Sequence, residues 1–150
     1  MALRITRRLE FDAGHRVLGH EGKCRHLHGH RYVVLLTVQA PKLDELGRVV
    51  DFSVLKSIMG RWIDGNLDHN ILLHEDDPLL KIWMDNPACE IFAQKEPYVM
   101  QSGNPTAENI AEEIYKKAEQ LLPSPLSVTK VRVYETPNCF ADYWDSSSVH

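Results

Sequence analysis

The sequence predicts an α+β fold in one domain that spans residues 1–150. Two observations carry this prediction: three segments have the residue pattern of β-strands, and two segments place apolar residues at helical spacing. A chain of 150 residues is also long enough to bury a core without disulfide bonds. Its hydrophobic content of 43% and charged content of 25% are typical of globular domains.

The first strand is expected over residues 3 to about 15. Apolar and polar residues alternate at its C-terminal end, and every second side chain of a strand points to the same face. One face is formed by Leu9, Phe11, Ala13 and His15. His15 therefore lies at the end of an apolar face.

A second strand is expected from His28 up to Pro41. It follows a polar loop that contains glycine, and its residues HGHRYVVLLTVQA are rich in β-branched and aromatic types. A continuous apolar run of this kind is typical of a strand that is buried on both faces.

Two helices are expected further along the chain. The first begins at Asp51, a suitable N-cap, and stops at Gly65. Its apolar stripe consists of Val54, Leu55, Ile58 and Trp62. The second begins at Thr106, carries the acidic Glu108 in its first turn and ends before Pro123. Its apolar stripe consists of Ile110, Ile114, Ala118 and Leu121.

A third strand is expected over VTKVRVYET, where Val131, Val133 and Glu135 share one face, so that a carboxylate ends an apolar face. Residues 75–104 show no clean period apart from LLKIW, which could form a short helix, and we interpret them as an insertion. The serine-rich residues 145–150 are expected to form a flexible tail.

Composition excludes several classes of function. The formal net charge is −4 and the lysines and arginines are scattered, which gives no electrostatic footprint for nucleic acid. No apolar run approaches the roughly 18 residues of a membrane span. The N-terminus lacks the apolar segment of a secretory signal. We therefore expect a cytoplasmic protein with neither a nucleic-acid nor a membrane partner.

The three cysteines are Cys24, Cys89 and Cys139. An odd number at wide spacing argues against a disulfide framework, so at least one thiol is expected to be free. Cys89 and Cys139 are interpreted as small buried hydrophobic residues. Cys24 differs from them because it lies close to a group of histidines.

Five of the eight histidines lie in one short stretch, at positions 15, 20, 26, 28 and 30. His28 and His30 are two residues apart, so both imidazoles of a strand project from one face and can bind one ion. His15 would complete a set of three from the neighbouring strand. Three imidazoles with an open fourth position are typical of a catalytic zinc site. The spacing alone leaves His26 as an alternative to His28.

Three further residue types point to acid–base chemistry and binding. The Cys24 thiol can lie beside the metal, where a cation raises the thiolate fraction; the alternatives are a fourth zinc ligand and a packed thiol. Asp68 can orient the adjacent His69 at the turn after the first helix, which suggests a proton-handling pair. Glu135 suits the paired N–H groups of an aminopyrimidinone ring, unless it is simply solvated at the strand end.

Six segments in this order support a family resemblance. They are FDAGHR (11–16), C-x-x-x-H-G-H (24–30), GRVVDFSVLK (47–56), LDHN (67–70), NPTAENIAEEI (104–114) and VYET (133–136). Together they resemble the 6-pyruvoyltetrahydropterin synthase family, which includes the 6-carboxytetrahydropterin synthase of queuosine biosynthesis. The resemblance implies a tunnelling fold: a four-stranded antiparallel sheet with two helices on one face, whose trimer closes into a β-barrel and is commonly paired as a hexamer.

The resemblance also implies roles for individual residues, with active sites between subunits. The zinc ligands would be His15, His28 and His30. The catalytic groups would be Cys24 as the base and Asp68 with His69 as a dyad supplied across an interface. The substrate-binding residues would be Glu135 as the pterin anchor and Thr106 and Glu108 in the pocket segment. The insertion at 75–104 and the additional His26 depart from the family pattern.

The implied substrate is 7,8-dihydroneopterin triphosphate. We expect the carboxy branch of the family, in which triphosphate and acetaldehyde are lost, and the pyruvoyl branch of tetrahydrobiopterin biosynthesis is the alternative. A zinc hydrolase and a non-catalytic, zinc-stabilised binding module are the alternatives from other classes.

Overall fold

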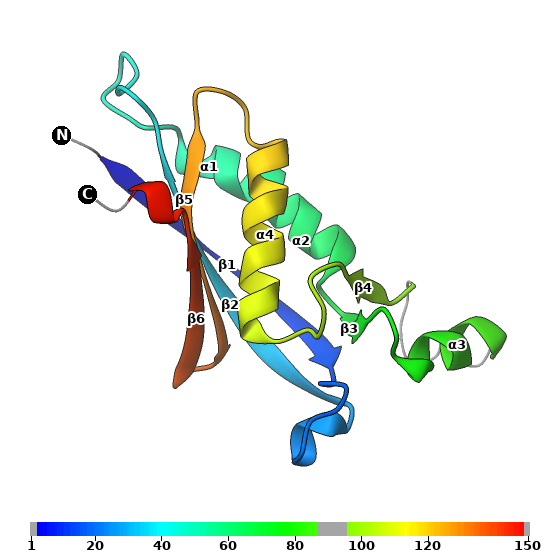
Figure 1. The fold of residues 1–150 in the computed structure, drawn as a ribbon. Coiled ribbons are helices and arrows are strands. Elements are labelled where there is room, and N and C mark those ends of the chain that lie inside the picture. The colour runs from blue at the N-terminus through cyan, green and yellow to red at the C-terminus, as the bar shows by residue number, and fades with distance from the viewer. Residues whose placement is uncertain (1–2, 87–95, 149–150) are drawn as a thin grey trace.

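The computed structural model describes residues 3–86 and 96–148, and its largest element is a six-stranded sheet (Figure 1). The strand order is β4-β3-β1-β2-β5-β6. The strands are β1 (Arg4–His15), β2 (His28–Gln39), β3 (Asn70–His74), β4 (Tyr98–Met100), β5 (Ser127–Thr136) and β6 (Cys139–Trp144). Strands β1, β2, β5 and β6 pair antiparallel, whereas β3 is parallel to both β1 and β4.

The expected four-stranded antiparallel sheet is therefore only part of the observed sheet. The three strands expected from the residue patterns are confirmed as β1, β2 and β5, and β6 completes the antiparallel part. The parallel strands β3 and β4 were not expected. The short apolar segment NILLH directly follows the first helical run, and its pairing from Ala13↔Asn70 to His15↔Leu72 satisfies the free edge of β1. The sheet is consequently mixed.

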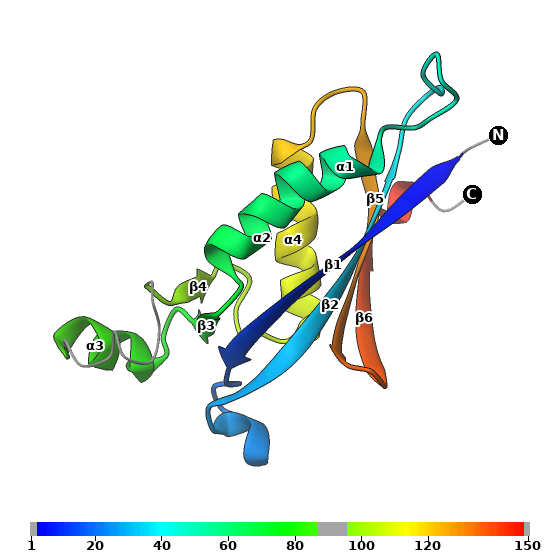
Figure 2. The same ribbon diagram turned by 180° about the vertical axis from the view of Figure 1, so that it is seen from behind.

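Two helical runs cover one face of the sheet and leave the other face uncovered (Figures 1 and 2). The first run comprises α1 (Phe52–Leu55), a π-helical segment, η2 (Lys56–Gly60), and α2 (Arg61–Asn66), and the second is α4 (Ala107–Leu121). Asp51 caps the first run by accepting a hydrogen bond from the Ser53 amide, as expected, but the helix continues past Gly65 to Asn66. Thr106 caps α4 by accepting from the Asn109 amide at 3.2 Å.

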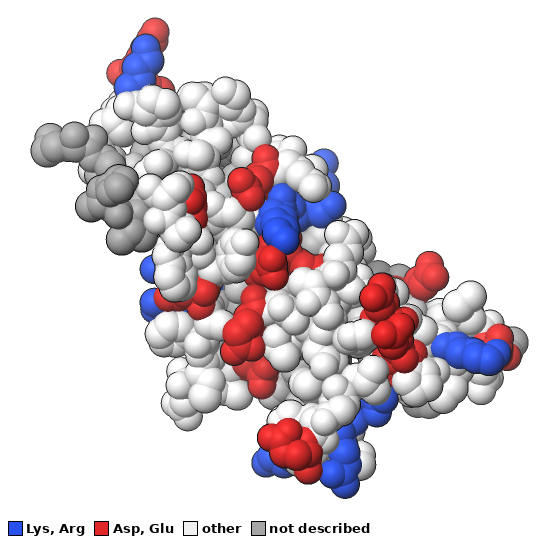
Figure 3. Space-filling model, in the orientation of Figure 1, with Lys and Arg blue, Asp and Glu red and all other residues white. Residues whose placement is uncertain are grey.

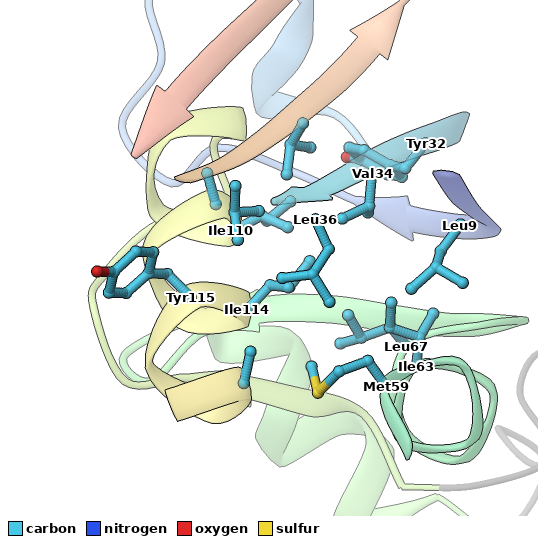
Figure 4. Close-up of a cluster of buried hydrophobic side chains, with 14 of the residues drawn as sticks. Leu9, Tyr32, Val34, Leu36, Met59, Ile63, Leu67, Ile110, Ile114 and Tyr115 are labelled. Carbon is cyan, nitrogen blue, oxygen red and sulfur yellow. The ribbon is translucent and has the colours of Figure 1, made fainter. Parts of the chain in front are cut away.

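The hydrophobic core lies between this face of the sheet and the helices (Figure 4). Figure 4 shows Val34 and Leu36 of β2 facing side chains of the two helical runs. The core partners from the helices are Met59, Ile63, Ile110 and Ile114, each at most 1% exposed. Full burial of one such side chain contributes roughly 1.5–3 kcal/mol. The strand β2 is not buried on both faces as expected, because the helices cover one face only and, apart from the buried Thr37, the side chains on the other face are half-buried or exposed.

Residues 75–104 contain one helix and one strand within the described ranges. The helix α3 (Pro78–Asp85) includes the LLKIW segment, projects beyond the sheet (Figure 1) and has no buried residue. The strand β4 brings the chain back to the sheet, where Met100 is 1% exposed. The end of this segment therefore belongs to the core. Cys89 lies outside the described residues.

The last described elements are β6 and a short 3-10 turn, η4 (Ser146–Ser148), and residues 149–150 lie outside the described ranges. Cys139 at the start of β6 is exposed, and the expectation that it is buried is wrong, because only one side of the β5–β6 hairpin meets the helices. Within 3–86 and 96–148 no helix is long and apolar enough to cross a membrane. On the face shown in Figure 3, Asp and Glu side chains form a band down the middle, and Lys and Arg side chains lie in separate groups.

Candidate active site and metal centre

Three histidines meet on the helix-covered face, near one end of β1 and β2. The antiparallel register places His15 opposite His28 and Ala13 opposite His30, so the three imidazoles project from the same face. Their candidate ligand atoms all lie within 4.8 Å of one another. The ring centroid of His15 lies 4.6 Å from that of His28 and 5.0 Å from that of His30. The cluster expected from the sequence is confirmed as a group that could hold a metal ion.

Backbone carbonyls fix the orientation of two of these rings. The Nδ1 atom of His15 lies 2.7 Å from the Pro105 carbonyl, and that of His28 lies 2.7 Å from the His26 carbonyl. Because a carbonyl can only accept, each Nδ1 carries the proton and each Nε2 presents a lone pair. The two Nε2 atoms are 3.1 Å apart, close to the roughly 3.3 Å expected for two imidazoles on one tetrahedral zinc ion. Lone pairs at this distance repel unless a cation binds both.

The third imidazole supplies the clearest sign that a group binds here. The Nε2 atom of His30 is buried and has no hydrogen-bond partner among the described residues; a Glu135 carboxylate oxygen lies 3.5 Å away. Burial lowers the pKa of both His15 and His30, so these imidazoles are neutral at pH 7 and available as ligands. The residues present therefore fit a metal that prefers nitrogen ligands.

His26 is not part of this cluster. Its side chain is exposed, and its backbone carbonyl accepts the hydrogen bond that orients His28. The alternative in which His26 replaces His28 as a ligand is thereby removed. The residue supports the site through its backbone, a role that spacing along a strand does not reveal.

A pocket of about 250 Å³ adjoins the metal cluster and collects most of the other expected site residues. Its wall includes His15, Cys24, Thr106, Glu108 and Glu135. Cys24 lies on the 3-10 turn η1 (Lys23–Arg25) and is a free, half-buried thiol. Glu135 extends the buried face of Val131 and Val133, and its side chain is 28% exposed, so its carboxylate is available at the pocket wall. Thr106 serves as the N-cap of α4 as well as lining the pocket.

Asp68 and His69 form the expected pair, but they lie away from the pocket that contains Cys24. His69 adopts a left-handed backbone with φ of 55°, which turns its ring so that Nδ1 lies 2.8 Å from an Asp68 carboxylate oxygen. The other oxygen of that carboxylate accepts from the Asp12 amide at 2.9 Å. The His69 side chain is 72% exposed. A carboxylate on Nδ1 leaves Nε2 free to exchange a proton.

The pair opens onto the opposite face of the sheet from the Cys24 pocket. A hollow of about 620 Å³ beside the pair is lined by His69, Asp12 and Arg31, and also by residues 28–30 at the start of β2. Asp12 and Arg31 alternate along β1 and β2 with the histidines of the cluster, so their side chains point to the other face. Within one chain, the structure does not bring the Asp68–His69 pair to Cys24.

Sequence reasoning missed two contributors to this site. Pro105 orients His15 through a carbonyl, and His20 lines the pocket from the loop before Cys24 while its Nδ1 accepts from the Gly22 amide at 2.8 Å. A backbone carbonyl leaves no signal in the sequence. His20 is one of the five histidines between positions 15 and 30, but it lies in a loop. A loop has no regular period from which the direction of its side chain could be predicted.

These features define an α+β protein with a three-histidine candidate metal centre beside a pocket that holds a thiol and a carboxylate. The comparison with known families gives the particular assignment. The chain belongs to the 6-pyruvoyl tetrahydropterin synthase family, whose family model matches residues 4–146. Members of this family are pterin-synthesising enzymes by name, and the resemblance inferred from the six sequence segments is confirmed.

Individual relatives agree with this assignment. A protein of Rickettsia typhi named 6-carboxy-5,6,7,8-tetrahydropterin synthase is 43% identical over 144 residues, which cover 93% of this chain and 99% of the relative. A Bacillus subtilis protein of the same name is 32% identical, covering 81% of this chain and 70% of its own.

Two solved structures share the fold. An uncharacterised protein from Wolinella succinogenes has a TM-score of 0.83 at 24% identity, covering 97% of this chain and 99% of its own. The 6-pyruvoyl tetrahydropterin synthase of Caenorhabditis elegans has a TM-score of 0.69 at 23% identity, covering 97% of each chain.

Proposed function

We propose that this protein is a 6-carboxy-5,6,7,8-tetrahydropterin synthase that converts 7,8-dihydroneopterin triphosphate with loss of triphosphate and acetaldehyde, a carbon–oxygen lyase of queuosine biosynthesis. The observation that carries the proposal is the pocket that joins the Cys24 thiol and the Glu135 carboxylate to the three-histidine cluster. The relatives that are 43% and 32% identical and bear this name support the choice of branch. The cytoplasmic localisation stays a prediction.

We propose zinc as the metal, held by His15, His28 and His30. An all-imidazole set of three suits zinc and leaves a position open for substrate. When bound, zinc supplies a Lewis acid that makes the hydroxyl and adjacent C–H protons of the substrate side chain easier to remove. The chain itself prepares the ligands: two carbonyls hold Nδ1–H of His15 and His28, and burial keeps His15 and His30 neutral.

The remaining residues of the pocket divide binding and proton transfer between them. Glu135 accepts hydrogen bonds from the paired N–H groups of the pterin ring, which aligns the side chain of the substrate with the cluster. The Cys24 thiolate takes a proton from that side chain as the general base. Thr106 and Glu108 form the wall at the start of α4 and limit the pose of the substrate.

The second proton-transfer group is supplied by another copy of the chain. Asp68 and His69 open onto the face opposite the Cys24 pocket, and the His69 imidazole is 72% exposed. A homo-oligomer, trimeric or hexameric with barrel-like closure of its sheets, would bring this pair to the pocket of a neighbour. The half-buried side chains on the face that no helix covers support such an assembly.

Product analysis tests the proposed reaction. The purified protein, supplied with zinc, is incubated with 7,8-dihydroneopterin triphosphate, and acetaldehyde, triphosphate and the pterin product are measured. Release of acetaldehyde with a 6-carboxy product is expected. Triphosphate without acetaldehyde would assign the chain to the pyruvoyl branch, and the absence of any turnover would favour a zinc-stabilised binding module.

A cysteine variant separates the synthase from a zinc hydrolase. Cys24→Ala is expected to lose nearly all activity, because the base is removed while the metal cluster stays. A hydrolase that uses metal-bound hydroxide would retain most of its activity in this variant. Zinc per chain is measured on the same sample, because loss of the metal would also remove the activity.

A further inference from the structure

The loop that carries Cys24 has no fully buried side chain. Residues 16–27 connect β1 to β2 at one end of the sheet (Figure 1), and none of them is buried. The turn η1 also lacks a side-chain cap. Since burial of apolar side chains normally fixes a loop on a domain, the position of this one depends on polar contacts.

One contact within the loop sets the place of Cys24. The Val17 amide donates to the Cys24 carbonyl at 2.9 Å, which ties the start of the loop to the turn that bears the thiol. Contacts that hold the neighbours of Val17 and Cys24 therefore also hold the thiol.

Arg16 links this loop to a buried carboxylate of the 75–104 segment. Its Nε donates to Asp77 Oδ2 at 2.7 Å, and its terminal nitrogen donates to the Arg25 carbonyl at 3.0 Å. The Asp77 side chain is fully buried and its other oxygen accepts from the Leu79 amide at 2.9 Å, so it is itself fixed at the start of α3. The Arg16 guanidinium thus connects the fixed Asp77 carboxylate to Arg25, the residue that follows Cys24.

Asn104 holds the other side of the loop. Its side-chain oxygen accepts from the Leu18 amide at 2.8 Å, and its side-chain nitrogen donates to the Leu18 carbonyl at 3.0 Å. The Asn104 carbonyl accepts from the Thr106 amide at 2.8 Å and from the Asn109 side chain at 2.9 Å. Asn104 is therefore fixed to the start of α4. Its side-chain amide forms two hydrogen bonds with the backbone of Leu18, as a neighbouring strand would.

We infer that Arg16, Asp77 and Asn104 are positioning residues that hold the Cys24 thiol in register with the three-histidine cluster. The inference rests on the proposed function, in which Cys24 is the general base. It assigns a task to the 75–104 segment, whose two ends supply Asp77 and Asn104. A base that shifts by about 1 Å loses roughly a hundredfold in rate while substrate binding elsewhere is retained.

Two variants and a matched control test this inference. Arg16→Lys keeps a cation beside the buried Asp77 but cannot span to the Arg25 carbonyl as well. Asn104→Asp keeps the size of the side chain and the acceptor for the Leu18 amide but removes the donor to the Leu18 carbonyl. The control is Arg48→Lys, because Arg48 also bridges two partners, Asp44 and Asp51, in the loop at the opposite end of the sheet (Figure 2).

Three quantities are measured on each variant: kcat and KM with 7,8-dihydroneopterin triphosphate, zinc per chain, and amide hydrogen exchange of peptides from residues 16–27 and from β1 and β2. For Arg16→Lys and Asn104→Asp we expect kcat to fall about 10- to 100-fold with KM and zinc content retained. Exchange is expected to rise in residues 16–27 only. Arg48→Lys should change none of these quantities.

Retained kcat in both variants would overturn the inference, as would loop exchange equal to that of the unmodified protein. A fall in kcat that follows loss of zinc, or faster exchange throughout the strands, would assign these residues a general structural role instead. If the unmodified protein produces no pterin product, the proposed function fails; the exchange of residues 16–27 then still decides whether the three residues hold the loop.

Discussion

Tyr32→Phe should stabilise this protein, although the tyrosine is completely buried. Tyr32 is 0% exposed in β2, and its hydroxyl has no hydrogen-bond partner among residues 3–86 and 96–148. Its ring stacks on Phe11 with centroids 4.8 Å apart, a contact that phenylalanine retains. Burial also raises the pKa of Tyr32, so the hydroxyl remains protonated and gains nothing from ionisation. The substitution removes an unsatisfied polar atom and little else.

The expected gain follows from the desolvation of that hydroxyl. A buried hydroxyl without a partner costs roughly 1–3 kcal/mol, and the small void left by the oxygen offsets part of this, so we expect a gain of about 1 kcal/mol. For a chain of this size, 1 kcal/mol corresponds to roughly 2–4 °C in Tm.

Tyr115→Phe provides a control with the opposite sign. Tyr115 is also buried, at 6% exposed, but its hydroxyl donates to the Val128 carbonyl at 2.9 Å. Loss of this hydrogen bond should lower the free energy of unfolding by roughly 0.5–1.5 kcal/mol. Both variants are unfolded by urea and by heat at one fixed protein concentration, after removal of metal with EDTA, with circular dichroism as the signal.

Equal destabilisation by the two substitutions would refute the reasoning. It would mean that the Tyr32 hydroxyl is hydrogen-bonded in solution, for example to a buried water beside the histidine cluster. A gain for Tyr32→Phe and a loss for Tyr115→Phe would confirm that satisfaction of the hydroxyl, and not the loss of an oxygen atom, determines the sign.

Three further predictions concern the site and one ion pair. His30→Ala should abolish stoichiometric zinc binding, measured by atomic spectroscopy on dialysed protein, and retention of zinc would contradict the three-histidine cluster as its site. His69→Asn should leave Tm nearly unchanged, because asparagine tolerates the φ of 55°, while kcat falls about 10²–10⁴-fold; an unchanged kcat would exclude His69 from proton transfer. The Arg132 guanidinium lowers the pKa of Asp142 through hydrogen bonds of 2.7 and 2.9 Å, so this pair stabilises the fold above the ordinary Asp pKa of 3.8 and loses its effect as the pH falls through the lowered value. The difference in urea stability between the unmodified protein and Asp142→Asn should therefore shrink below about pH 4, and a difference that does not vary with pH would argue against the ion pair as its cause.

Local pattern was sufficient for the parts of this protein that depend on near neighbours in the chain. The two-residue period of a strand placed His28 and His30 on one face and His15 at the end of an apolar face, and the caps at Asp51 and Thr106 marked the starts of two helices. These features follow from backbone geometry over a few residues, so the sequence alone determines them.

Contacts between distant segments decided the rest. The Pro105 carbonyl orients His15, Asn104 holds Leu18, and NILLH joins the edge of β1, and each of these pairs residues that are far apart in the chain. No period records such contacts, because they arise only when the helices pack on the sheet. The same packing separates the Asp68–His69 pair from Cys24 on opposite faces, which adjacency in the sequence could not show. The face that carries the histidines was therefore determined by the sequence itself, whereas the choice of His28 over His26, the supports of the cluster and the division of the site between two faces were determined by tertiary structure.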